Sequence, residues 1–282
     1  AENLARARNL SVIGAVVKPV QPDRLLALMA NRPQRQVTRA KSSSAPAITP
    51  AMLEAAIEAG DLQPWFQPKI DIASRQPVAV EVLARWPRSK LGPVFPDVFI
   101  PLAESSGLID SLTFALIKEA ISNQARWRER GIELKLAANV SMDSLLKLDF
   151  LQRLEETVSS VGGELAGLQL EVTESRLMED LVAPLDTLLR LRLKKVRLSI
   201  DDFGTGHSNL SQLRDLPFDE LKLDRSYVQN AGGGDRAATI LESSVEIAKK
   251  LGMSIVAEGV ETLEEWQRVE RLGCDQVQGW FA

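Results

Sequence analysis

The chain of 282 residues is long enough for one barrel of about 250 residues together with a small additional piece. Its hydrophobic content of 45% supports a large core, and no apolar run approaches the roughly 20 residues of a membrane span. No charged and apolar leader is recognisable, so we expect a soluble cytoplasmic protein with no membrane partner. The single cysteine, Cys274, and the single histidine, His207, exclude a disulfide framework and the usual zinc sites, so oxygen atoms must hold any metal.

The net charge of −4 is unevenly shared along the chain. Residues 1–50 carry eight Lys and Arg side chains against two acids, whereas the remainder carries 26 against 36. Such an acidic domain is a poor partner for a nucleic acid polymer, because binding to one depends on neutralising its phosphates. We therefore expect a small substrate, or a metal that inverts the local charge.

The first fifty residues do not share the pattern of the rest. Residues 11–17 predict a buried strand, Lys18-Pro19 follows it, and residues 22–29 predict a short amphipathic helix. The run at residues 14–19 resembles the end of a response-regulator receiver domain, in which a lysine before a proline contacts the phosphorylated aspartate; an ordinary strand and turn is the alternative.

This resemblance divides the chain into three parts. It implies that residues 1–31 are the C-terminal remnant of a flavodoxin-like receiver domain, whose phosphoacceptor lies upstream, and that a sensor kinase is a partner. Residues 32–50 are rich in Arg, Gln, Ser, Ala and Pro without periodicity, which is typical of a linker. Thr49 and Pro50 then predict a helix start, and residues 51–282 form the catalytic domain.

Short apolar runs recur along that domain, and each ends on or carries a side chain able to bind metal or handle a proton. In chain order these side chains are Glu81, Asn139, Glu171, Asp201 with Asp202, Lys222, Glu258 and Gln278. The segments between the runs include helical patterns, one of which opens with the capping-box pair Thr262 and Glu265. Strand, functional side chain and helix in repetition predict a (β/α)8 TIM-type barrel with its site at the C-terminal ends of the strands. An open doubly wound sheet would not readily collect polar side chains from seven strands.

Two of these positions have simpler interpretations. Asp201 and Asp202 could cap a turn, since Asp is common where a chain leaves regular structure, but the recurrence along the chain favours a site. Lys222 lies in an otherwise apolar strand, where an ammonium is costly unless it is paired, so a buried salt bridge is its alternative to a catalytic role.

Eight short motifs follow one another along the chain in the order that a known family shows. They are Glu81-Val82-Leu83 (EAL, with Val in place of Ala), residues 96–109 (PxxFIPLAExxGLI), Asn139-Val140-Ser141 (NxS), residues 171–174 (ExTE), 201–206 (DDFGTG), 221–224 (LKID), 257–262 (AEGVET) and Gln278-Gly279-Trp280 (QGY). From about residue 53 onward, the chain resembles the EAL family of cyclic-di-GMP phosphodiesterases. Each motif alone is weak, but their order and number exclude chance.

The resemblance implies two cations per site, Mg²⁺ or Mn²⁺. Glu81, Asn139, Glu171 and Asp201 would hold the first ion, Asp201 would bridge to the second, and Asp202 and Glu258 would complete the second site. Two such ions about 3.5 to 4 Å apart can supply a hydroxide, neutralise a phosphate oxygen and assist the departing alkoxide.

The resemblance also assigns further roles. Glu81, Lys222, Glu258 and Gln278 would be catalytic, with Lys222 acting on the attacking water as base or electrostatic stabiliser and Gln278 positioning it. Gln67, Leu83, Arg85 and Asp224 would contact substrate. Glu174, Phe203, Gly204, Thr205 and Gly206 would couple the site to a contact in a homodimer or higher homo-oligomer.

The expected reaction is hydrolysis of cyclic-di-GMP to linear 5′-pGpG, regulated through the receiver domain. A catalytically inactive EAL domain that binds the dinucleotide is the chief alternative, although such domains usually lose a metal-binding acid or the lysine. A barrel lyase or aldolase with Lys222 as a Schiff-base amine is a third possibility, but it leaves the acid cluster without a role.

Overall fold

The computed structural model describes residues 48–281, apart from 90–91, 174–181, 205–215 and 231–235. The expected receiver remnant at residues 1–31 and nearly all of the linker at 32–50 lie outside the described residues. Glu174, Thr205 and Gly206 lie outside them as well. The division of the chain into receiver remnant, linker and catalytic domain therefore stays a prediction.

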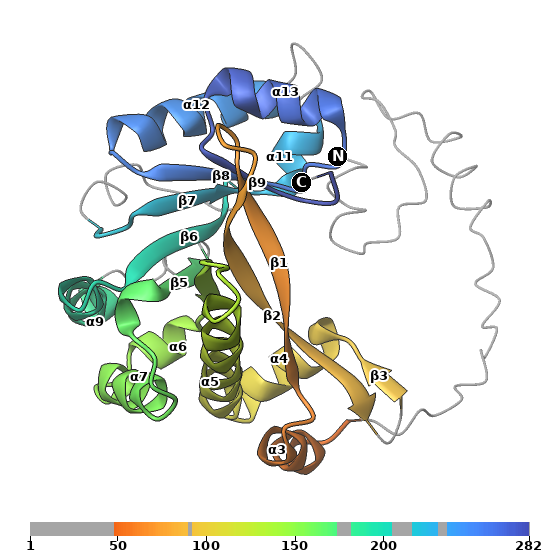
Figure 1. Ribbon diagram of the computed structural model, residues 1–282, viewed down its shortest axis with the longest axis vertical. Helices are drawn as coiled ribbons and strands as arrows, with labels where there is room; N and C mark the ends of the chain where they lie inside the picture. Colours follow the sequence, from red (N-terminus) through yellow and green to blue (C-terminus); the bar gives the residue numbers. More distant parts are fainter. Residues whose placement is uncertain (1–47, 90–91, 174–181, 205–215, 231–235, 282) are drawn as a thin grey trace, which may run out of the picture. The chain divides into compact units, whose positions relative to one another are not determined.

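The described residues form strands and helices in alternation after an initial helix and hairpin (Figure 1). The strands are β1 (Gln63–Asp71), β2 (Pro77–Ser89), β3 (Gly92–Val94), β4 (Lys135–Asn139), β5 (Leu168–Thr173), β6 (Arg197–Phe203), β7 (Glu220–Leu223), β8 (Ser254–Glu258) and β9 (Gln276–Gln278). The helices are α3 (Pro50–Ala59), α4 (Pro96–Ser105), α5 (Ile109–Arg128), α6 (Met142–Leu145), α7 (Phe150–Ser159), the 3₁₀ turn η1 (Leu165–Gly167), α9 (Val182–Leu193), α11 (Arg225–Asn230), α12 (Arg236–Lys250) and α13 (Leu263–Leu272).

Eight of the strands close into a barrel, as predicted. Their order is β1-β9-β8-β7-β6-β5-β4-β2, β1 also pairs with β2, and β3 adds to β2 outside the ring. Strands β2 and β4 to β9 run parallel to one another, whereas β1 runs antiparallel to both of its neighbours. The barrel therefore departs from a regular (β/α)8 barrel at one strand, because a short hairpin turn and not a helix joins β1 to β2.

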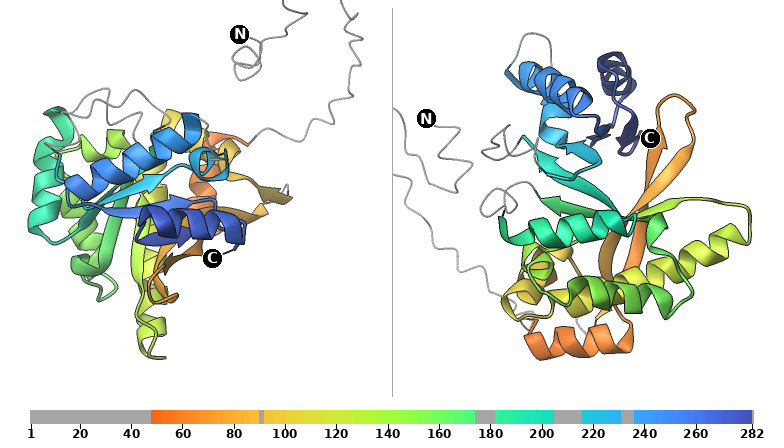
Figure 2. Two further views of the ribbon diagram at one scale, coloured as in Figure 1. Left: turned by 90° about the horizontal axis from the view of Figure 1, so that it is seen from above. Right: turned by 90° about the vertical axis from the view of Figure 1, so that its left-hand side faces the viewer.

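Helices cover the outside of the ring. Figure 1 shows α12 and α13 beside the β7–β9 part of the barrel, and α5, α7 and α9 beside the β4–β6 part; Figure 2 shows the same arrangement from two further sides. The predicted helix starts are confirmed: the Thr49 hydroxyl accepts from the backbone N–H of Met52, and Thr262 with Glu265 forms a capping box at α13. No helix in the described ranges is long and apolar enough to cross a membrane.

The apolar core lies between the strands and this layer of helices, whereas the inside of the barrel holds most of the buried polar side chains. Leu170 and Leu198 are fully buried on the outward faces of their strands, next to inward-facing Glu171 and Ser199. Cys274 is also buried, and burial raises the pKa of its thiol to about 12, so it is an inert core residue. The site is therefore built from polar side chains that the barrel encloses.

One buried carboxylate outside the barrel joins three helices. Asp110, in the first turn of α5, accepts hydrogen bonds from the Ser144 hydroxyl of α6 at 2.5 Å, from Lys147 at 2.7 Å and from Arg153 of α7 at 2.9 Å. Burial raises the pKa of Asp110, but the donors and charges of its three partners outweigh burial and hold that pKa below its usual value. The ionised carboxylate thus fixes α6 and α7 against α5.

Replacing Asp110 by asparagine should lower the free energy of unfolding by about 1.5 to 3 kcal/mol, because two cations lose their shared acceptor charge. Urea unfolding at pH 7 measures this difference. Since the pKa of Asp110 is lowered in the folded state, its contribution is present above the unfolded-state pKa and disappears as the pH falls through the folded-state pKa. The control is Glu246→Gln, at an exposed acid of α12 that pairs with Lys250. It should change the free energy of unfolding little, both at pH 7 and at a pH below the folded-state pKa of Asp110.

Candidate active site

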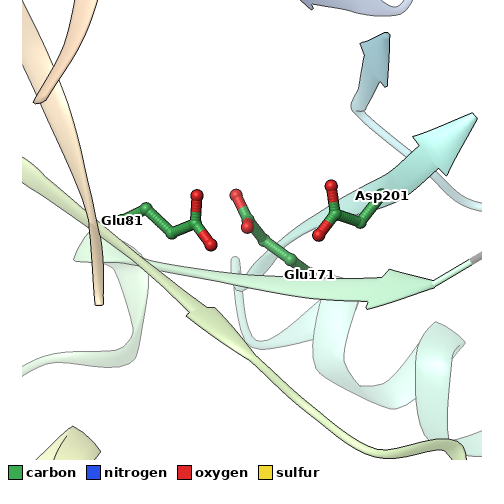
Figure 3. A group of neighbouring side chains, drawn as sticks. All are labelled: Glu81, Glu171 and Asp201. Carbon is green, nitrogen blue, oxygen red and sulfur yellow. The ribbon is translucent and has the colours of Figure 1, made fainter. Parts of the chain in front are cut away.

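The predicted strand-end side chains converge on the mouth of the barrel. Figure 3 shows the carboxylates of Glu81 from β2, Glu171 from β5 and Asp201 from β6 turned toward one another. One oxygen from each lies within 4.8 Å of the other two, and Asp201, Asp202 and Glu258 form a second group with the same property. Asp201 belongs to both groups, so the geometry provides two adjacent oxygen-rich positions that share one carboxylate.

Lys222 lies at the centre of the acids. Its ammonium is fully buried and contacts four carboxylates, at 3.2 Å to Glu81, 2.8 Å to Glu171, 3.0 Å to Asp201 and 2.7 Å to Glu258. The buried salt bridge considered above is therefore present, with four acids in place of one. A lysine in this place can serve both as their counter-ion and as a donor to a bound phosphate or water.

Two amides complete the ring of side chains around Glu81. Asn139 donates to Glu81 Oε1 at 2.8 Å, and Gln278 donates to Glu81 Oε2 at 2.7 Å. The Gln278 Oε1 acceptor is buried and has no hydrogen-bond partner among the described residues, so it is available to a bound group. Gly279 permits this placement, because a Cβ at that position would collide with the backbone of Val260.

The charges of the cluster are visible in its pKa values. Burial, together with neighbouring acids, raises the pKa of Asp201 to about 6 and that of Glu258 to about 8, although Lys222 acts in the opposite direction. Burial also raises the pKa of Glu171, but Lys222 and Lys69 outweigh it and the net shift is downward. The converging carboxylates thus outnumber the two lysines that contact them, and further positive charge would stabilise these acids.

Divalent cations with a preference for oxygen fit these positions. Carboxylate and amide oxygens are the donors that Mg²⁺ and Mn²⁺ prefer, and the two overlapping groups of acids supply them in the required number. Both groups consist of carboxylates alone, and His207, the single histidine of the sequence, lies outside the described residues.

A cavity of about 670 Å³ opens above the acids. Gln67, Leu83 and Arg85, which the family resemblance assigns to substrate, line it together with Glu81, Asp201, Glu258 and Gln278. Two exposed aromatic side chains, Trp65 and Trp280, form part of its wall, and the Arg85 guanidinium lies over the Trp65 ring at 5.8 Å from the centroid. The cavity thus combines a cation, flat aromatic surfaces and an acidic floor.

The other predicted residues lie around this cavity in different ways. Asp224 accepts from the backbone N–H of Ser226 at 3.0 Å at the start of α11. Burial, and after it the charge of Asp224, raises the pKa of Asp202. Phe203 is buried at the end of β6, and the carbonyl of Gly204 accepts from the Tyr227 hydroxyl. The expected contact of Asp224 with substrate and the coupling through Phe203 and Gly204 stay predictions.

Sequence reasoning missed two charged residues beneath the acids. Lys69 and Glu220 are fully buried, and the Lys69 ammonium contacts Glu171 at 2.6 Å and Glu220 at 2.8 Å. Alternation could have found both: Lys69 follows Gln67 by two positions, and Glu220 precedes Lys222 by two, so each shares the inward face of its strand with a predicted site residue.

The structure is a closed β/α barrel domain with a cluster of carboxylates at its mouth that could hold a metal ion. The chain belongs to the EAL domain family, whose match covers residues 51–282. This agrees with the resemblance stated from the motifs.

Individual relatives extend the comparison. The chain is 37% identical over 216 residues to the cyclic di-GMP phosphodiesterase PA2567 of Pseudomonas aeruginosa. This alignment covers 77% of the present chain and 37% of PA2567. The chain is 30% identical over 273 residues to the cyclic di-GMP phosphodiesterase RocR of the same organism, covering 96% of this chain and 70% of RocR. The solved structure of the PaMucR phosphodiesterase in complex with c-di-GMP is 35% identical, with a TM-score of 0.77 over 82% of this chain and 94% of that one.

Proposed function

We propose that this protein hydrolyses cyclic-di-GMP to linear 5′-pGpG, and that residues 51–282 form the phosphodiesterase domain. The observation that carries the proposal is the convergence of Glu81, Glu171, Asp201, Asp202 and Glu258 around Lys222 in two overlapping groups. Relatives that are named cyclic di-GMP phosphodiesterases, and a similar structure in complex with c-di-GMP, support the choice of substrate.

The reaction adds water across one of the two phosphodiester bonds. The bond from phosphorus to the 3′-oxygen breaks, so the linear product carries a 5′-phosphate and a free 3′-hydroxyl. Two bound ions, Mg²⁺ or Mn²⁺, would activate the water, neutralise the phosphate and stabilise the leaving oxygen. Glu81, Asn139, Glu171 and Asp201 would hold one ion, and Asp201, Asp202 and Glu258 the other.

The remaining groups act on water and substrate. Gln278 has a free buried acceptor that can orient the attacking water, and Arg85 has the forked donors that suit a phosphate oxygen. In the absence of bound ions, four carboxylates outweigh burial and raise the pKa of Lys222 well above its usual value. Its contacts with these four acids suit an ammonium that stabilises developing negative charge, whereas the Schiff-base alternative leaves the acids without a role.

The inactive-receptor alternative is disfavoured by the complete set of acids and the lysine. We further propose that residues 1–31 belong to a receiver domain that responds to a sensor kinase, that residues 32–50 link it to the barrel, and that the protein works as a homodimer or higher homo-oligomer. Glu174 and residues 203–206 would then connect the site to the contact between subunits.

Incubation of the purified protein with cyclic-di-GMP and Mg²⁺, followed by chromatography, should yield pGpG. A chelator should stop the reaction, and Glu81→Ala should lower turnover at least about 100-fold, because Glu81 also orients Asn139 and Gln278. The matched control is Glu246→Ala, at an exposed acid of the outer helix α12, and its turnover should equal that of the unaltered protein. Binding of cyclic-di-GMP with no product at any Mg²⁺ or Mn²⁺ concentration would favour the receptor instead.

A further inference from the structure

A second layer of polar side chains lies inside the barrel beneath the acids. Gln169, Ser199 and Glu220 each precede a site residue by two positions on β5, β6 and β7, and so face the same interior. Lys69 reaches this layer from the opposite direction: since β1 is antiparallel, Lys69 pairs with Ala79, two residues before Glu81.

Glu220 is the anchor of this layer. Its Oε1 accepts from the Lys69 ammonium at 2.8 Å, from the Ser199 hydroxyl at 3.1 Å and from the Gln169 amide. All four side chains are buried, and Lys69 and Glu220 are 0% and 1% exposed. The ammonium of Lys69 is therefore held in one place by the Glu220 carboxylate, which is itself fixed by donors from β5 and β6.

The other contact of Lys69 is with Glu171, one of the acids at the mouth of the barrel. Lys69 donates to Glu171 Oε1 at 2.6 Å, while Lys222 donates to Glu171 Oε2 at 2.8 Å. The two oxygens of Glu171 are thus bound by different lysines on opposite sides. Lys222 divides its charge among four acids, whereas Lys69 contacts, among the described residues, one acid besides Glu171, namely Glu220. Lys69 does not line the cavity, so its effect on substrate must pass through Glu171.

Stability does not explain why an ion pair occupies this place. Replacing a buried ion pair by uncharged side chains of similar volume is often neutral or stabilising, because desolvation of the charges offsets their attraction. A ligand carboxylate, in contrast, gains from a partner that fixes its orientation, as ligands of metal sites commonly do.

We propose that Lys69, anchored by Glu220, is a positioning residue that orients the carboxylate of Glu171 for cation binding. The proposal rests on the proposed function in that it takes Glu171 as a metal ligand. Its test therefore measures cation binding directly, in the absence of substrate.

The informative variant is Lys69→Met with Glu220→Gln, which removes one charge of each sign and leaves Glu171 its contact with Lys222. Calorimetric titration with Mn²⁺ should show affinity reduced about 10- to 100-fold. The thermal unfolding midpoint without Mn²⁺ should stay close to that of the unaltered protein. Turnover of cyclic-di-GMP should recover as the Mn²⁺ concentration rises, so that the loss lies in metal affinity and not in kcat.

Two further variants complete the test. Lys147→Met removes a lysine that also pairs with a buried carboxylate, Asp110, but outside the barrel, and should leave Mn²⁺ affinity unchanged. Lys69→Arg keeps a cation at the site and should restore part of the affinity that the double variant loses. If the double variant does not fold, Glu220→Gln alone, which keeps an acceptor for Lys69, takes its place and should still weaken Mn²⁺ binding relative to the unaltered protein.

Unchanged Mn²⁺ affinity in the folded variant would overturn the positioning role while leaving the proposed function intact. Mn²⁺ binding by the unaltered protein without hydrolysis would overturn the proposed function, while the positioning role would still be decided by the variants. Absence of Mn²⁺ binding by the unaltered protein would overturn both.

Discussion

Replacing Lys222 by methionine is expected to abolish turnover, with a loss of at least about 1,000-fold, because the buried ammonium at the centre of the site stabilises developing negative charge. Methionine matches the length of the aliphatic stem but has no charge. Four carboxylates then lose their shared counter-ion. The assay is product formation from cyclic-di-GMP at saturating Mg²⁺.

The affinity of this variant for Mn²⁺ should not fall together with its turnover. Since Lys222 contacts the same carboxylates that would hold the ions, its removal leaves more negative charge for them, and Mn²⁺ affinity should be retained or increased. Without ions the variant should unfold at a lower temperature than the unaltered protein, and added Mn²⁺ should restore the midpoint by mass action. Turnover within tenfold of the unaltered protein would contradict the role assigned to Lys222.

The second large effect is expected at Asp201, the one carboxylate shared by both groups of acids. Asp201→Asn keeps the size of the side chain but removes the charge that two ions would share. We expect turnover to fall at least about 1,000-fold and Mn²⁺ binding to weaken at both positions, because a neutral amide replaces the negative charge that both ions would share. Calorimetric titration gives the number of ions bound and their affinities.

Asp202→Asn is the matched comparison, since it makes the same chemical change at the adjacent residue. Asp202 belongs to only one of the two groups. Its backbone has a φ of +55°, in the left-handed region that Asn tolerates as well as Asp, so the substitution should not disturb the turn. The variant should bind one Mn²⁺ ion more weakly and leave the affinity for the other ion unchanged. Equal effects of the two substitutions on both ions would refute the bridging role of Asp201.

Much of the barrel could be predicted because its signals are local. Strands β4 and β8 lie where short apolar runs ended on Asn139 and Glu258, and β7 lies where such a run carries Lys222. Helix α13 begins at the capping box that Thr262 and Glu265 predict. Strand β2 was placed less well. It continues to Ser89, so Glu81 lies within a strand and not at its end, because the antiparallel partner β1 pairs with the residues beyond it.

The depth of a side chain could not be predicted in the same way. Lys69 was visible in the sequence only as a charge near the start of the domain, where long basic side chains usually reach solvent. Its partners Glu171 and Glu220 are 102 and 151 residues away, and nothing local connects them. Their meeting depends on closure of the ring through β9 and on the reversed direction of β1.

The sequence by itself determined the family, the barrel and the identities of the acids, amides and lysine that gather at its mouth, because each motif lies within a few residues of a strand end. Only the tertiary structure decided which acids share a position, that Lys222 contacts four of them at once, and that a second ion pair lies below. Those facts follow from the stagger of eight strands around a closed ring, which sets how far each side chain reaches into the barrel and cannot be read from any one strand.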